Sequence, residues 1–179
     1  MSKLVELIPV TGGQTLRQIK KLYREAFPRC ERKPFAVIWE KSRKGQMELL
    51  AIDSEGFAGL VITVLYGDIV LLDYFAVSPE RRGDGIGSAV MALLQSRYAG
   101  KRLLLEIEDP DVPCDNREER ERRRRFYLRN GLTVMPYCIT LFGVPMRVLT
   151  RGGAVSFAEY HAVYACTFSP LLAQNVRER

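Results

Sequence analysis

Residues 71–88 read LLDYFAVSPERRGDGIGS, which predicts a strand, a glycine-rich turn and the start of a helix. Glycines allow a turn to bring its backbone amides close to a ligand, because no Cβ stands in the way. The N-terminus of a helix adds unpaired N–H groups and the positive end of the helix dipole. The stretch therefore predicts a phosphate-binding turn. The competing interpretation is that its glycines serve only tight turning and close packing.

The spacing of the glycines separates the possible phosphate ligands. Gly83, Gly85 and Gly87 give G-x-G-x-G, which differs from the dinucleotide fingerprint G-x-G-x-x-G and from the P-loop G-x-x-x-x-G-K-[ST]. Arg82, Gly85 and Gly87 instead match the R/Q-x-x-G-x-G/A signature of the GNAT acetyltransferases, placed after a strand that ends in Ala76-Val77. On these residues the chain resembles the GNAT superfamily, in its bacterial form.

The segments around the turn extend this resemblance over roughly residues 47–150. Further along the chain, residues 126–132 (FYLRNGL) end a predicted helix that starts near Asn116, and they resemble a GNAT motif. The predicted strands are Leu4–Val10, Met47–Asp53, Phe57–Tyr66, Ile69–Val77, Leu103–Glu108, Leu132–Phe142 and Met146–Thr150. The other predicted helices begin at capping boxes at Thr15 and Ser156, and a short one covers Phe35–Lys41.

Composition and element order predict one domain that spans residues 1–179. The 179 residues are 47% hydrophobic and 27% charged, as in a compact globular protein. The fold class is mixed α/β (α+β). The resemblance implies a mostly antiparallel central sheet of about six to seven strands, with helices on both faces and two central strands that splay apart.

Several classes of protein are disfavoured. No apolar run approaches the roughly 20 residues of a spanning helix, and the N-terminus does not resemble a signal peptide, so we expect a cytoplasmic protein without a membrane partner. Four scattered cysteines and the single His161 predict reduced thiols and no metal site. The net charge of +6 favours anionic partners. Nucleic acid is not expected, because acids alternate with the arginines between Glu118 and Arg125 and no aromatic residues are interleaved with that run.

The resemblance implies that acetyl-CoA is the co-substrate. Backbone groups of Phe75, Ala76 and Val77 would pair with its pantetheine arm, and one N–H would stabilise the thioester oxygen. Its diphosphate would lie on the turn. The implied cofactor-binding residues of the turn are Arg82, Gly83, Asp84, Gly85, Ile86, Gly87 and Ser88, with Tyr127 as a further contact.

Three side chains are candidates for proton transfer. An alkyl amine with a pKa of about 10 is protonated at neutral pH, so a base must accept its proton, and Asp73 or Glu106 could do so. Tyr127 matches the family tyrosine that protonates the departing CoA thiolate. Each has a plainer alternative, since a strand acid can simply face solvent and a helix tyrosine can fill the core. Arg120 stands where many family members have an asparagine that contacts the cofactor, which is a departure from the pattern.

The predicted function is N-acetylation of a primary amine of a small molecule or peptide, by direct attack on acetyl-CoA in a ternary complex. A different class of function is a non-catalytic acyl-CoA-binding module with a sensing or scaffolding role. The resemblance places acceptor walls on the N-terminal helices and the final hairpin, where no motif identifies the amine. The sequence leaves the oligomeric state open, and a homodimer is compatible with it.

Overall fold

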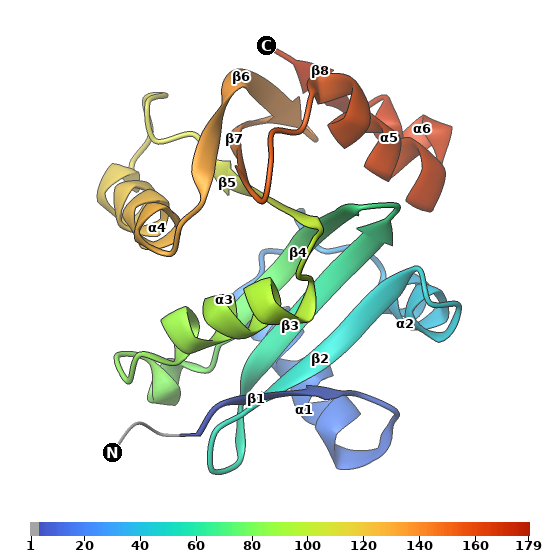
Figure 1. Ribbon diagram of the computed structural model, residues 1–179, viewed down its shortest axis with the longest axis vertical. Coiled ribbons are helices and arrows are strands. Elements are labelled where there is room, and N and C mark those ends of the chain that lie inside the picture. Colours follow the sequence, from blue (N-terminus) through green and yellow to red (C-terminus); the bar gives the residue numbers. More distant parts are fainter. Residues whose placement is uncertain (1–3) are drawn as a thin grey trace. The chain divides into compact units, whose positions relative to one another are not determined.

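A computed structural model describes residues 4–179 (Figure 1). Its strands are β1 (Glu6–Pro9), β2 (Met47–Asp53), β3 (Phe57–Tyr66), β4 (Ile69–Val77), β5 (Arg102–Glu108), β6 (Thr133–Leu141), β7 (Val144–Arg151) and β8 (Val176–Glu178). Its α-helices are α1 (Gly13–Ala26), α2 (Phe35–Arg43), α3 (Ile86–Arg97), α4 (Arg117–Arg129), α5 (Phe157–Thr167) and α6 (Pro170–Ala173), and a 3-10 turn covers Pro79–Arg81. None of the helices within residues 4–179 has the length and apolar character needed to cross a bilayer.

The strands follow the order β1-β2-β3-β4-β5-β7-β6-β8 in one mostly antiparallel sheet. This confirms the predicted mixed α/β class, with eight strands instead of six or seven. The additional strand is β8, which pairs antiparallel with β6 through Ile139–Leu141. Three residues are too few for a period of two to be recognised in sequence, which is why β8 was not predicted.

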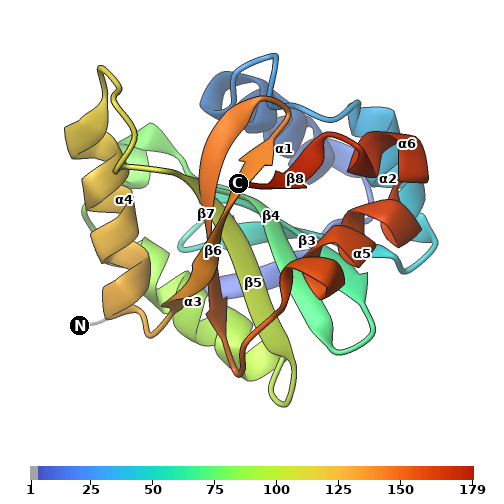
Figure 2. The same ribbon diagram turned by 90° about the horizontal axis from the view of Figure 1, so that it is seen from above.

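The chain forms two compact units, residues 4–65 with 72–99 and residues 66–71 with 100–179. The first unit contains β1, β2, most of β3 and the end of β4. Its helices α1 and α2 cover one face of these strands and α3 covers the other (Figures 1 and 2). Residues 58–64 of β3 are consequently all buried, and the strand is a nearly continuous apolar run instead of an alternating one.

The second unit is built on β5, β7, β6 and β8. Figure 2 shows α4 on one side of these strands and α5 with α6 on the other. Residues 69–71 of β4 belong to this unit, where they pair in parallel with Arg102–Leu104 of β5. The parallel register covers these three pairs, and the other edge of β5 pairs antiparallel with β7 over Leu103–Glu108.

Gly59 has a packing role that the sequence did not suggest. A Cβ on Gly59 would lie 2.3 Å from the carbonyl oxygen of Ala76. Such a distance is far inside van der Waals contact, so only glycine lets β3 and β4 approach this closely. Ala76, whose carbonyl makes this close contact, is one of the residues predicted to bind the pantetheine arm.

The helix caps and one turn agree only in part with those predicted. The capping box at Ser156 is present, with the Ser156 hydroxyl accepting from the Glu159 amide and the Glu159 carboxylate accepting in return. The box predicted at Thr15 is wrong, because α1 begins at Gly13 after Gly12, and the Asn116 side chain does not cap α4. Two residues with positive φ, Phe142 and Gly143, form the turn between β6 and β7, one residue earlier than predicted.

Candidate functional site

The glycine-rich turn joins β4 to α3 within the first unit. Gly83 and Gly85 have φ values of +90° and +76°, and open space surrounds the position that a Cβ would take on each. These glycines are therefore required by backbone conformation and not by crowding, since L side chains are strained at positive φ. Gly85 is the N-cap of α3 in the left-handed conformation and provides no side-chain cap.

The start of α3 presents backbone donors instead of a side-chain cap. The first amides of an α-helix, here those of Ile86, Gly87 and Ser88, have no acceptor inside the helix. The side chain of Ile86 is buried, together with those of Val90, Met91 and Leu94, and this apolar stripe holds the helix against the strands of its unit. The helix dipole adds partial positive charge at the same end. This arrangement is suited to an anion such as a diphosphate.

The two arginines of the turn are attached to neighbouring backbone. Arg82 Nε donates to the Val77 carbonyl at 3.3 Å, and Arg81 donates to the Ser54 carbonyl. The amide of Ser78, directly after β4, donates to the Ala58 carbonyl at 2.8 Å. The structure thereby brings the predicted cofactor-binding residues of β4 and of the turn together in one unit.

Asp73 makes an ion pair that the sequence did not predict. Lys33 Nζ lies 2.7 and 2.9 Å from its two carboxylate oxygens, and the two side chains are 14% and 3% exposed. Lys33 belongs to the loop between α1 and α2. Tyr74 fixes the same loop, because its hydroxyl accepts from the Lys33 amide and donates to the Glu31 carbonyl. Accepting a proton would require Asp73 to give up part of this ion pair.

Glu106 lies on β5 in the second unit, facing α5. Its Oε1 accepts hydrogen bonds from the hydroxyls of Tyr160 at 2.8 Å and Tyr164 at 2.7 Å. Both tyrosines are fully buried, and burial together with the Glu106 charge raises the pKa of the Tyr160 phenol well above its ordinary value. The tyrosines therefore remain donors and hold the carboxylate in one orientation.

Tyr127 lies on α4, half-buried, with its ring packed edge-on against that of Phe126. Desolvation raises the pKa of its phenol, and the smaller effect of Arg123 lowers it. The second unit does not bring Tyr127 beside Glu106, since α4 and α5 flank opposite sides of its strands (Figure 2).

The basic helix α4 is partly tied to its own unit. Arg120, at the position where many family members have asparagine, donates to Glu108 at 2.8 Å and to the Asp109 carbonyl at 3.1 Å. Arg124 pairs with Asp111 and Glu121. These arginines act as structural partners, while Arg122, Arg123 and Arg125 are exposed.

Sequence reasoning missed the partners of both candidate bases. Lys33 gives no local signal, because it pairs with a residue 40 positions away. Tyr160 and Tyr164 are four positions apart on a helix, so the sequence predicts that they share a helix face. No local pattern indicates that this face contacts Glu106. Across residues 4–179, no three His, Cys, Asp or Glu side chains cluster as a metal ion would require.

The chain is similar in sequence to known proteins. A family model described as an acetyltransferase (GNAT) domain matches residues 35–133. The Bacillus subtilis (strain 168) protein YjbC, named as a candidate acetyltransferase, is 30% identical over 99 residues, covering 51% of this chain and 49% of that protein. The chain thus spans about half the length of the curated relative it matches. The chain belongs to the GNAT acetyltransferase family.

Solved structures extend the likeness of fold. A candidate GNAT acetyltransferase of Bacteroides thetaiotaomicron has a TM-score of 0.77 at 20% identity, covering 94% of this chain and 98% of that one. An aminoglycoside 6'-N-acetyltransferase complexed with coenzyme A has a TM-score of 0.66 at 17% identity, with 83% and 96% covered. Identities this low show a shared fold, and substrates do not follow from fold.

Proposed function

We propose that this protein transfers the acetyl group of acetyl-CoA to a primary amine of a small molecule or peptide, by direct attack in a ternary complex. The observation that carries the proposal is the left-handed Gly85 at the start of α3, which leaves the first amides of that helix open to a phosphate. Family membership supports the same reaction class.

The turn is proposed to hold the diphosphate of the co-substrate. Amides of residues 85–88 would donate to it, and Arg82 would add charge beside the Val77 carbonyl that it contacts. Phe75, Ala76 and Val77 would offer backbone groups to the pantetheine arm. The aminoglycoside enzyme that shares this fold is complexed with coenzyme A, which makes the same ligand a reasonable proposal here.

We propose Glu106, in preference to Asp73, as the base that removes the proton from the amine. Both oxygens of Asp73 accept from Lys33, whereas the Glu106 carboxylate is oriented by two tyrosine donors on one oxygen. An oriented carboxylate can accept a proton directly or through one water. Asp73 is then a positioning residue that holds the loop between α1 and α2.

Tyr127 is proposed to protonate the departing thiolate. Its raised pKa keeps the phenol protonated throughout the neutral range, so it always holds the proton that the reaction needs. A thiol has a pKa of about 8.5 and an ordinary phenol one of about 10, so the raised pKa of Tyr127 widens the gap that proton transfer to the thiolate must overcome.

Two measurements test the proposal. Acetyl-CoA at a hundredfold excess over its Kd should stabilise the folded protein by about 2.7 kcal/mol, seen as a rise in melting temperature, because it binds the folded state alone. A screen of amines with thiol-release detection should then show turnover. Stabilisation without turnover on any amine would favour the non-catalytic acyl-CoA-binding module, and no stabilisation at millimolar acetyl-CoA would refute both.

A further inference from the structure

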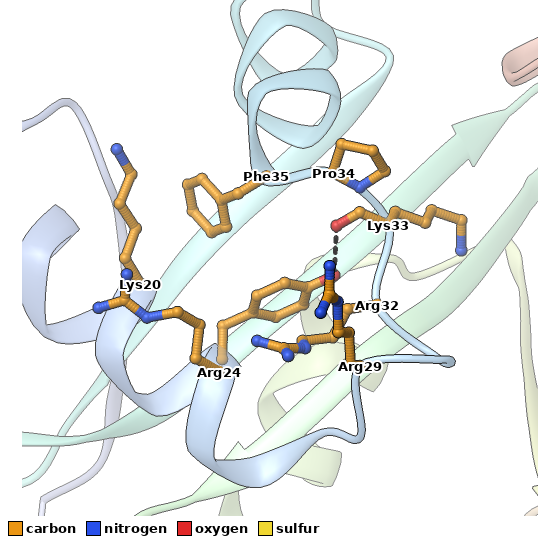
Figure 3. A pocket seen from close by; sticks show the side chains of 8 residues that line it. Lys20, Arg24, Arg29, Arg32, Lys33, Pro34 and Phe35 are labelled. Atoms are coloured by element: carbon orange, nitrogen blue, oxygen red, sulfur yellow. Dashed lines mark hydrogen bonds between the residues drawn. The ribbon is translucent and has the colours of Figure 1, made fainter.

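The loop between α1 and α2, together with α1, lines a cationic cavity to which the proposed function assigns no role. The cavity has a volume of about 470 Å³, within the range of small-molecule sites. Its lining is Lys20, Tyr23, Arg24, Arg29, Arg32, Lys33, Pro34 and Phe35. Figure 3 shows Lys20 and Arg24 reaching it from α1, Arg29 and Arg32 from the loop, and Phe35 from the start of α2.

The charge in this cavity has one sign. Five of the lining residues are cationic and none of them is acidic. Asp73 balances only Lys33. Gathering like charges around one space is unfavourable unless an anion joins them. Of the remaining four cations Lys20, Arg24 and Arg29 are exposed and Arg32 is half-buried, and together they give the cavity a positive potential that water partly screens.

One of these cations is incompletely bonded. The Nε of Arg32 is buried and has no hydrogen-bond partner among the described residues. Burying such a donor without a partner costs about 1–3 kcal/mol, and an arginine fork is shaped to bind two oxygens of a phosphate or carboxylate. Turning the Arg32 guanidinium toward an oxyanion in the cavity would supply the missing acceptor.

The rest of the lining is apolar and rigid. Tyr23 is 2% exposed, and its ring packs edge-on against those of Phe35 and Tyr74 at centroid distances of 5.5 and 4.8 Å. Its hydroxyl donates to the Lys33 carbonyl at 3.0 Å. Aromatic walls beside several cations suit a small organic ligand that carries one charged end, more than a bare ion.

The cavity is connected to the strand of the candidate active site. Lys33 lines the cavity and also pairs with Asp73 on β4, four residues before Val77. A ligand bound among these cations is therefore held by the same loop that is anchored to β4 through Lys33 and Tyr74.

We infer that this cavity binds the oxyanion of an acetyl acceptor, so that the preferred substrates are small amines that also carry a phosphate or carboxylate group. The inference rests on the proposed function, because it names the substrate class of that reaction. Several charged hydrogen bonds to one oxyanion account for the preference.

The test compares matched acceptors and matched variants. The acceptors are ethanolamine, O-phosphoethanolamine and β-alanine, which share an amine and differ in the group at the other end. Lys20→Gln/Arg24→Gln removes two cations that line the cavity. Arg17→Gln/Lys21→Gln removes the same two charges from exposed positions of the same helix outside the cavity.

We expect kcat/KM to be at least about tenfold higher for an acceptor with an oxyanion than for ethanolamine, and the cavity variant to abolish that advantage. The control variant should keep it. The melting shift with acetyl-CoA should be the same in all three proteins. The phosphate and carboxylate acceptors reveal which oxyanion is preferred.

A direct binding measurement separates this inference from the proposed function. Calorimetry with O-phosphoethanolamine and with inorganic phosphate, at constant ionic strength, should detect binding to the wild type and at least about tenfold weaker binding to the cavity variant, whether or not turnover occurs. Turnover that is equal for charged and uncharged amines, or phosphate binding unchanged in the cavity variant, would overturn the inference. If acetyl-CoA no longer raised the melting temperature of the cavity variant but still did so for the wild type and the control variant, the cofactor would lie in the cavity. That result would also overturn the inference.

Discussion

Lys33 holds both carboxylate oxygens of Asp73, at 2.7 and 2.9 Å, in a pair that is almost wholly shielded from water. Residues 33 and 73 belong to a loop and a strand far apart in the chain, and their pairing anchors the loop between α1 and α2. The pair gives the acidic residue of a buried strand a structural partner, whatever its part in chemistry.

We predict that Asp73→Asn destabilises the protein by about 3 kcal/mol, because it removes the carboxylate charge that faces the shielded Lys33 ammonium. Lys33→Met combined with Asp73→Asn should recover part of this loss. Urea unfolding of the two variants measures it. If Asp73→Asn kept full stability but lost all turnover, Asp73 would be the base and not a positioning residue.

Gly85→Ala should strain the backbone at the start of α3 and lower the affinity for acetyl-CoA about tenfold. Gly100→Ala is the matched control, because Gly100 follows the same helix with φ +80° and equally open surroundings. Both should lose about 1–2 kcal/mol of stability. Calorimetry with acetyl-CoA should find the affinity reduced for Gly85→Ala alone, and an equal reduction in both would argue against phosphate binding at the turn.

Tyr127→Phe should lower kcat by about a hundredfold, since a positioned acid contributes at least that much, and should leave the acetyl-CoA melting shift intact. Tyr137→Phe provides the control from the same unit, where it removes a hydroxyl that donates to the Val155 carbonyl at 2.9 Å. Steady-state kinetics decide the outcome. An unaltered kcat in Tyr127→Phe would mean that another donor protonates the departing thiolate.

Glu106→Gln should reduce kcat/KM by about a hundredfold while preserving the fold, because an amide oxygen still accepts from Tyr160 and Tyr164. The acidic limb of the pH–rate profile should disappear in the variant. Glu108→Gln, two residues further along β5, should retain that limb. A profile unchanged by Glu106→Gln would return the role of base to Asp73 or to water.

The acid sensitivity of α5 follows from Glu159. Hydrogen bonds from Arg102 and Ser156 lower the pKa of its carboxyl to about 2 from an ordinary 4.5. A lowered folded-state pKa contributes stability that is present above the unfolded pKa and lost as pH falls toward the folded one. Glu159→Gln should therefore cost stability at pH 7 and become neutral as pH falls from about 4.5 to 2. Urea unfolding across this range checks it, and a cost independent of pH would contradict the linkage.

Local patterns predicted the elements well where apolar runs are closed by clear turn residues. The bounds of β2, β3 and β4 agree with those predicted for this reason. Among the shorter features, the capping box at Ser156 was predicted correctly, whereas the cap at Thr15 and the strand β8 were not. The cap at Thr15 was misplaced since α1 starts at Gly13, and a glycine before a helix carries no side-chain signal of its own.

The sequence alone determined the GNAT membership, the order of elements up to β7 and the glycine-rich turn before α3, because each depends on neighbouring residues whose spacing is visible in one stretch of chain. Only the tertiary structure decided what Asp73 and Glu106 contact and why Gly59 must lack a side chain. These contacts join residues that are distant in sequence. The five cations of residues 20–33 are close in sequence, but only the folded loop between α1 and α2 gathers them around one cavity. Charge, distance and burial act through space, so no local pattern records them.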